Sequence, residues 1–182
     1  DQLINLYKQG QLSEVVDQSQ VLTKEYPDTF LLWNILGVSA SQIGMLDKAI
    51  EAFKKALLLK PDYTDVYNNL GNALRERGKL DQAINTYKKA LSINPDYHDA
   101  YYNLGNVLRE QGKFDESIEA FKKTLLLKPN YAEAISNMGN ALRDQGKLDE
   151  AIDAYNKSIS LNPEYAESYS NMGVALQDQG KL

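Results

Sequence analysis

The chain has 182 residues, enough for one ordinary domain with a sizeable core, and its hydrophobic fraction of 43% is a normal globular share. Its 20 basic and 25 acidic residues give a formal net charge of −5. This balance argues against nucleic acid as a partner, because neutralising phosphates requires a basic face. No apolar run reaches the ~18 residues of a membrane span, so we expect no membrane insertion.

The chain has no cysteine, which excludes disulfides and zinc–thiolate sites. Asp1 is not followed by a signal-peptide pattern. Both features favour a cytoplasmic location, since thiol-free chains fit a reducing compartment.

Proline and glycine recur with one fixed period of 34 residues. The five prolines are Pro27, Pro61, Pro95, Pro129 and Pro163. The eleven glycines form two series, 37, 71, 105, 139, 173 and 10, 44, 78, 112, 146, 180. A period of this length predicts a stacked repeat array in which each unit buries its apolar face against its neighbours.

We therefore expect a single array over residues 1–182. It begins with a partial repeat, 1–29, continues through full repeats 30–63, 64–97, 98–131 and 132–165, and ends with a partial repeat, 166–182. Each full repeat is expected to contain two helices. In the third repeat, Tyr67, Leu70 and Leu74 form the apolar stripe of the first helix.

The boundaries of the two helices follow from the punctuating residues of the same repeat. Gly78 is expected to end the first helix in a left-handed conformation. Asp81 is expected to be the N-cap of the second helix. That helix should stop near Asn94, because Pro95 disfavours the helical conformation of the residue before it.

Small residues are expected at the centre of each helical hairpin. Gly71 and Ala83 would face each other and allow the two helices to approach closely, with Tyr87 filling the space beside them. The matching pairs in the other full repeats are Gly37 with Ala49, Gly105 with Ser117, and Gly139 with Ala151.

The residues of this pattern resemble the tetratricopeptide repeat (TPR). The second repeat carries it as Trp33, Leu36, Gly37, Ala49, Phe53, Ala56 and Pro61. The resemblance covers essentially the whole chain; the first repeat diverges, with Leu3, Val15 and Ser19 at three motif positions. It implies an all-α, right-handed superhelix of antiparallel helix pairs, with the first helix of each pair on the concave side. Such proteins usually act as binding scaffolds for proteins or peptides.

The first helices also carry a polar stripe, which is the predicted ligand-binding groove. Its asparagines are Asn69, Asn72, Asn103, Asn106, Asn137, Asn140 and Asn171, its acidic edge includes Asp65, Asp99 and Glu133, and it is flanked by Arg75, Arg109 and Arg143. A carboxamide is both donor and acceptor, so it can pair with any peptide backbone. Because asparagine is a mediocre helix former, its recurrence suggests a use.

Three interpretations of the asparagines stay open: contact with a ligand, hydrogen bonds between neighbouring repeats, and a solvated surface left by duplication. A similar asparagine ladder occurs in the superhelix of O-GlcNAc transferase, which the chain resembles in the stretches NNLGNALRERG and YNLGNVLREQG. The acidic edge favours neutral or basic ligands. In the second repeat Leu31, Ile35 and Val38 replace the polar stripe, and we expect a hydrophobic anchor there.

Nothing in the sequence predicts catalysis. His98 is the only histidine, and with Asp96 and Asp99 it would make a poor metal site, so we expect no metal and no cofactor. The predicted function is a non-enzymatic protein- or peptide-binding scaffold. The alternatives are a substrate-recruiting arm of a glycosyl- or sulfotransferase and a self-assembling structural module. The sixth repeat ends after one helix, which predicts homo-oligomerisation through uncapped repeat ends.

Overall fold

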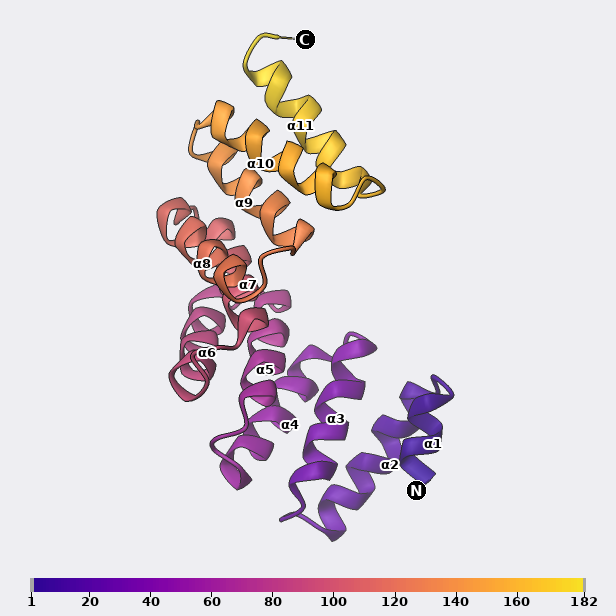
Figure 1. Ribbon diagram of the computed structural model, residues 1–182. Helices are drawn as coiled ribbons and strands as arrows, with labels where there is room; N and C mark the ends of the chain where they lie inside the picture. The colour runs from indigo at the N-terminus through magenta and orange to yellow at the C-terminus, as the bar shows by residue number, and fades with distance from the viewer. Residues whose placement is uncertain (1, 182) are drawn as a thin grey trace. The chain divides into compact units, whose positions relative to one another are not determined.

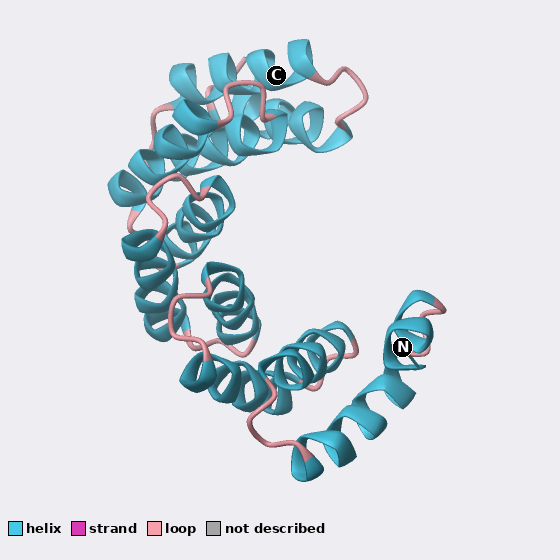
Figure 2. Ribbon diagram, turned by 60° about the horizontal axis from the view of Figure 1, so that its bottom comes forward, coloured by secondary structure: helices cyan, strands magenta, loops and turns pink. Residues whose placement is uncertain are grey.

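A computed structural model describes residues 2–181 of the chain. Within these residues the chain forms eleven α-helices and no strand, and short loops connect the helices (Figure 2). The chain divides into two compact units, Asp1–Pro95 and Asp96–Leu182. The prediction of a single array over residues 1–182 stays a prediction.

The first unit, Asp1–Pro95, contains six helices, and consecutive helices pack against each other (Figure 1). They are α1 (Gln2–Lys8), α2 (Leu12–Glu25), α3 (Phe30–Gln42), α4 (Leu46–Leu59), α5 (Thr64–Glu76) and α6 (Leu80–Ile93). The helices α3 and α5, which are the first helices of their repeats, also contact each other directly. The surface formed by α3 and α5 therefore lies within a single compact unit.

The second unit, Asp96–Leu182, repeats this arrangement with five helices. They are α7 (His98–Glu110), α8 (Phe114–Leu127), α9 (Ala132–Asp144), α10 (Leu148–Leu161) and α11 (Ala166–Asp178). The first helices of its repeats, α7, α9 and α11, contact one another in order. Phe121, Ile135 and Tyr155 are fully buried at the centre of the unit.

The loop inside each hairpin turns at a left-handed glycine, as predicted. Gly78 has φ +77° and Gly146 has φ +84°. The expected stop of the second helix at Asn94 is also confirmed, since α6 ends at Ile93 with Asn94 as its C-cap.

The prediction that Asp81 is an N-cap is wrong. The helix α6 begins at Leu80, so the N-cap is Lys79, two residues before Asp81, and its side chain makes no capping hydrogen bond. Asp81 lies in the first helical turn instead, where its negative charge still stabilises the helix by interacting with the helix dipole.

The aspartates at this register position connect successive repeats. Asp149 accepts a hydrogen bond from Gln179 Nε2 at 2.6 Å, and Asp47 accepts one from Arg77 Nε at 3.0 Å. The hydrogen bond from Arg77 lowers the pKa of the Asp47 carboxyl. The carboxylate thus contacts the turn that follows the next first helix.

The predicted close packing at the hairpin centre is confirmed. A Cβ atom added to Gly71 would lie 2.4 Å from Cε1 of the Tyr87 ring, which is fully buried. The hydroxyl of Ser117 donates to the backbone oxygen of Gly105 at 2.7 Å, so these two small residues are direct neighbours. Only glycine leaves room for the aromatic ring at this position.

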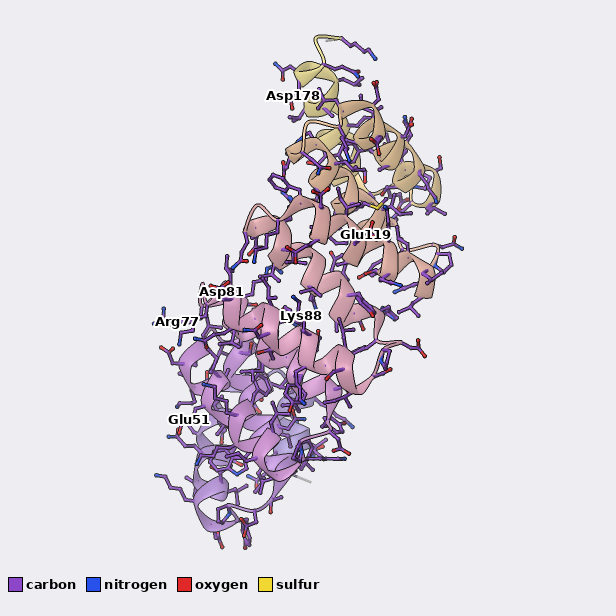
Figure 3. All side chains as sticks on the ribbon, turned by 90° about the vertical axis from the view of Figure 1, so that its left-hand side faces the viewer. Glu51, Arg77, Asp81, Lys88, Glu119 and Asp178 are labelled. Carbon is purple, nitrogen blue, oxygen red and sulfur yellow. The ribbon has the colours of Figure 1, made fainter. Side chains whose placement is uncertain are left out.

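The second helices expose side chains of both charges. Glu51 on α4, Lys88 on α6 and Glu119 on α8 are all exposed and labelled in Figure 3. Lys122 lies 2.7 Å from a carboxylate oxygen of Glu119. These helices therefore carry charges of both signs, some of which are paired.

Candidate peptide-binding surface

In the first unit, the predicted polar stripe lies beside a hollow between α3 and α5. The hollow has a volume of about 190 Å³ and is lined by Asn69, Asn72 and Glu76 from α5 and by Val38, Ser41 and Gln42 from α3, with Phe53 behind them. Its mixed polar lining could hold a peptide backbone.

The amides of this hollow differ in their partners. The hydroxyl of Tyr87 donates to Asn72 Oδ1 at 2.7 Å, which fixes the Asn72 carboxamide. Asn69 is half-buried, and within residues 2–181 its side chain has no hydrogen-bond partner. Asp65 and Glu76 are exposed, while Arg75 is half-buried. Asn69 is thus free to bond to a ligand.

A second hollow, between α1 and α3, has an apolar lining. It measures about 220 Å³ and is lined by Leu3, Ile4, Tyr7, Asn34, Ile35 and Val38. Leu31 is 53% exposed on the same helix as Ile35 and Val38. The upstream surface that was expected to be apolar therefore contains a hollow large enough for one bulky side chain.

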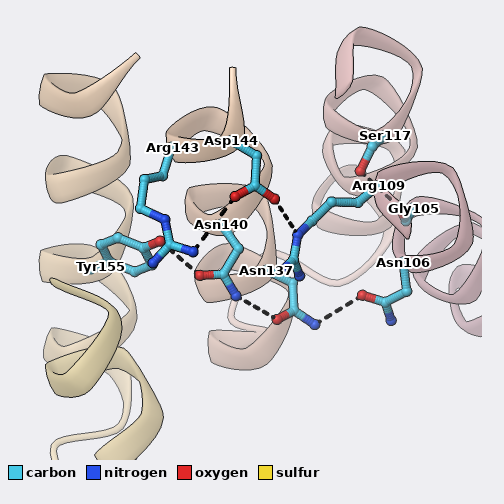
Figure 4. A network of polar contacts seen from close by, with 9 residues as sticks. All are labelled: Gly105, Asn106, Arg109, Ser117, Asn137, Asn140, Arg143, Asp144 and Tyr155. Atoms are coloured by element: carbon cyan, nitrogen blue, oxygen red, sulfur yellow. Dashed lines mark hydrogen bonds and ion pairs between the residues drawn. The ribbon is translucent and has the colours of Figure 1, made fainter. Parts of the chain in front are cut away.

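In the second unit, the asparagines form a hydrogen-bond network between α7 and α9 (Figure 4). Asn137 Nδ2 donates to the Tyr102 hydroxyl at 3.0 Å and to Asn106 Oδ1 at 3.1 Å. Asn140 Nδ2 donates to Asn137 Oδ1 at 3.4 Å, and the Tyr155 hydroxyl donates to Asn140 Oδ1 at 2.7 Å. Asn137 therefore makes hydrogen bonds between neighbouring repeats, which was one of the three interpretations of the asparagines.

Burial raises the pKa of the hydroxyl that donates to this network. Tyr155 is fully buried, and desolvation raises the pKa of its hydroxyl to about 12. Asn140 is only 4% exposed. The other two asparagines predicted for the groove in this unit, Asn103 and Asn171, are half-buried, and Asn171 Nδ2 is a buried donor without a partner within residues 2–181.

The flanking arginines of the second unit converge on one carboxylate. Arg109 Nε lies 2.8 Å from Asp144 Oδ2, and Arg143 Nη2 lies 3.6 Å from Asp144 Oδ1 (Figure 4). Glu133 is exposed, and Asp99 lies 3.0 Å from His98 Nδ1. Since Asp144 contacts both arginines, their charge is partly neutralised within the protein.

Some residues of the candidate site were missed by sequence reasoning. Tyr7 and Asn34 line the apolar hollow, and Tyr102 accepts from Asn137. Asn34 and Tyr102 occupy the same repeat position, two registers apart. Comparing that position across the repeats would have shown that a large side chain stands there in one pair of neighbouring first helices and a small one in the other.

Neither a metal cluster nor a membrane span is found in the part of the chain that the structure describes. Residues 2–181 contain no group of three or more potential metal ligands. None of the helices in this range has the length and apolarity needed to cross a membrane.

The profile of the family described as TPR repeat matches residues 42–74, 71–108 and 139–180, and the profile described as Tetratricopeptide repeat matches residues 98–131. The chain belongs to the tetratricopeptide-repeat family. The predicted fold class, an all-α TPR solenoid, is confirmed with it. No curated protein matches the chain.

Solved TPR structures resemble this chain over most of its length. A crystal structure of MamA is 29% identical, with a TM-score of 0.85 over 92% of this chain and 98% of that chain. TTC0263, a thermophilic TPR protein from Thermus thermophilus, is 26% identical, with a TM-score of 0.72 over 96% and 95%. YrrB is 19% identical, with a TM-score of 0.79 over 92% and 87%, and shares the fold.

Proposed function

We propose that this TPR chain is a non-catalytic scaffold that binds proteins or extended peptides along the first helices of its repeats. The observation that carries the proposal is the hollow of about 190 Å³ beside Asn69, whose carboxamide has no partner within residues 2–181. The solved structure of YrrB is described as that of a TPR protein with an unusual peptide-binding site, which supports peptide binding as a use of this fold.

The chemistry of the surface supports an extended ligand read through its backbone. Asn69 offers two N–H donors and one carbonyl acceptor, so it can pair with a backbone amide whatever the peptide sequence. The carboxylates of Asp65 and Glu133 are exposed, and that of Asp99 is half-exposed, along the first helices of their own units. Neutral or basic ligands are therefore favoured over acidic ones.

The proposal is tested by selecting peptides from a displayed library of random, unstructured sequences on the immobilised chain. We expect enrichment of neutral or basic peptides, and weaker binding of the selected peptides to Asn69→Ala. Asn85→Ala is the matched control, because Asn85 is exposed on the second helix α6. Failure to enrich any peptide, or equal loss of binding in both variants, would overturn the proposal.

The two alternatives from the sequence, an enzyme's recruiting arm and a self-assembling module, stay hypotheses. Self-association would use the apolar side chains exposed on α11, where Tyr169 is 46% and Val174 is 42% exposed. Light scattering over a concentration series is expected to show a rising mass, and a constant monomer mass would contradict it. A cytoplasmic location and the exclusion of nucleic acid also stay predictions, supported by composition and charge.

A further inference from the structure

Two equivalent pairs of first helices differ in how their facing surfaces are joined. In the second unit the pair is linked by hydrogen bonds of an asparagine, and in the first unit the matching asparagine makes none within residues 2–181. The α7–α9 pair of the second unit corresponds by register to the α3–α5 pair of the first, and Asn137 corresponds to Asn69. Asn137 has two acceptors on the preceding first helix, the Tyr102 hydroxyl and Asn106 Oδ1. These acceptors hold the carboxamide between the helices.

In the first unit both acceptors are replaced. Asn34 stands at the register of Tyr102, and Val38 stands at the register of Asn106. Val38 has no acceptor, and the Oδ1 atom of Asn34 is buried without a hydrogen-bond partner within residues 2–181, so neither residue bonds to Asn69. Val38 lines the hollow of about 190 Å³ beside the unpaired Asn69, whereas Asn34 lines the apolar hollow.

The polar hollow and the apolar hollow are neighbours. Val38 lines both, and Gln42 Nε2 from the polar hollow donates to the hydroxyl of Tyr7, which lines the apolar hollow, at 3.1 Å. We call the two together the α1–α3–α5 trough. It offers, in sequence, a space for an apolar side chain, a free carboxamide, and the exposed carboxylate of Glu76.

The charges around the trough select its occupant. Glu76 lines the polar hollow and Asp65 is exposed on the same helix, α5. Arg77, the nearest arginine in the sequence after Glu76, is paired with Asp47 at 3.0 Å. An exposed carboxylate next to a polar cleft favours a cationic side chain of the ligand.

We propose that the α1–α3–α5 trough binds an extended segment of a partner protein that carries a bulky aliphatic side chain and, a few residues further along, a lysine or arginine. The aliphatic side chain fills the hollow between Leu3 and Ile35, the backbone bonds to Asn69, and the cation lies beside Glu76. This inference rests on the proposed function and names the ligand class for the first unit.

The test begins with the peptides selected from the displayed library, measured by fluorescence anisotropy. Replacing the aliphatic residue of a selected peptide by alanine is expected to weaken binding by about tenfold or more. The double variant Asn34→Tyr, Val38→Asn installs the residues of the hydrogen-bonded α7–α9 pair and should weaken binding by a similar factor.

A charge exchange keeps the test independent of folding. Glu76→Lys is expected to weaken binding of the basic peptide by about two- to fivefold. Changing the lysine of the peptide to glutamate is expected to restore its binding to this variant. Glu51→Lys is the control, because Glu51 is exposed on the second helix α4. Its substitution should leave the binding unchanged.

The outcomes separate this inference from the proposed function. The inference is overturned, and the scaffold function stands, if the peptides that bind through Asn69 lack the aliphatic and basic pair. The same holds if their affinity is unchanged by both Glu76→Lys and the double variant. If no peptide is enriched at all, both are overturned. Enrichment of aliphatic–basic peptides with the charge exchange at Glu76 supports both.

Discussion

Replacing Gly71 with leucine is expected to destabilise the chain by ~1–3 kcal/mol or more. The Cβ atom alone would lie 2.4 Å from Cε1 of Tyr87 and 2.7 Å from its Cζ. The ring cannot swing away, because Tyr87 is fully buried and its hydroxyl is held by Asn72 Oδ1 at 2.7 Å. Urea unfolding followed by circular dichroism measures the loss.

Gly173→Leu is the matched control for this prediction. Gly173 occupies the same register position on α11, but a Cβ there would meet nothing within 4 Å. Because leucine is a better helix former than glycine by up to about 1 kcal/mol, this variant should be neutral or slightly more stable. Equal destabilisation by both substitutions, or none by Gly71→Leu, would contradict the packing described for the hairpin.

Asn137→Ala is expected to lower the free energy of unfolding by ~1–3 kcal/mol, whereas Asn69→Ala should change it by no more than ~0.5 kcal/mol. Removing the Asn137 carboxamide takes the donor from Asn106 Oδ1 and the Tyr102 hydroxyl, and the acceptor from Asn140 Nδ2. The Asn69 side chain has no such partners within residues 2–181. Thermal and urea unfolding of the two variants measures the difference.

The pair of variants is informative because the two asparagines occupy one repeat position in helices of equal length. Intrinsic helix propensity therefore contributes equally to both results. A larger loss in Asn69→Ala than in Asn137→Ala would mean that the network in Figure 4 does not stabilise the second unit.

The helices and their boundaries could be predicted because few residue types determine them. Gly78 adopts the left-handed conformation that ends a first helix, and Pro95 requires the second helix to stop. The role of Asp81 was mispredicted because aspartate is favoured both at the N-cap and in the first turn of a helix. Since α6 begins at Leu80, Asp81 lies in the first turn.

The roles of the asparagines could not be predicted from their spacing. Asn69 and Asn137 are identical in type and register, but the residues that face them from the preceding first helix differ. Tyr102 and Asn106 accept hydrogen bonds from Asn137, whereas Asn34 and Val38 stand at these two positions before Asn69. Such a difference depends on contacts between repeats rather than on periodicity within one. The apolar hollow depends likewise on Leu3, which lies in the divergent first repeat.

We expect a peptide ligand to bind through the free carboxamide of Asn69 and to leave the bonded carboxamide of Asn137 undisturbed. The side-chain NH₂ signals of both residues, assigned in nuclear magnetic resonance spectra of the ¹⁵N-labelled chain, report on it directly during titration with a selected peptide. We predict that the Asn69 signals shift in a saturable manner while those of Asn137 stay in place. Shifts of the Asn137 signals with unchanged Asn69 signals would contradict the account.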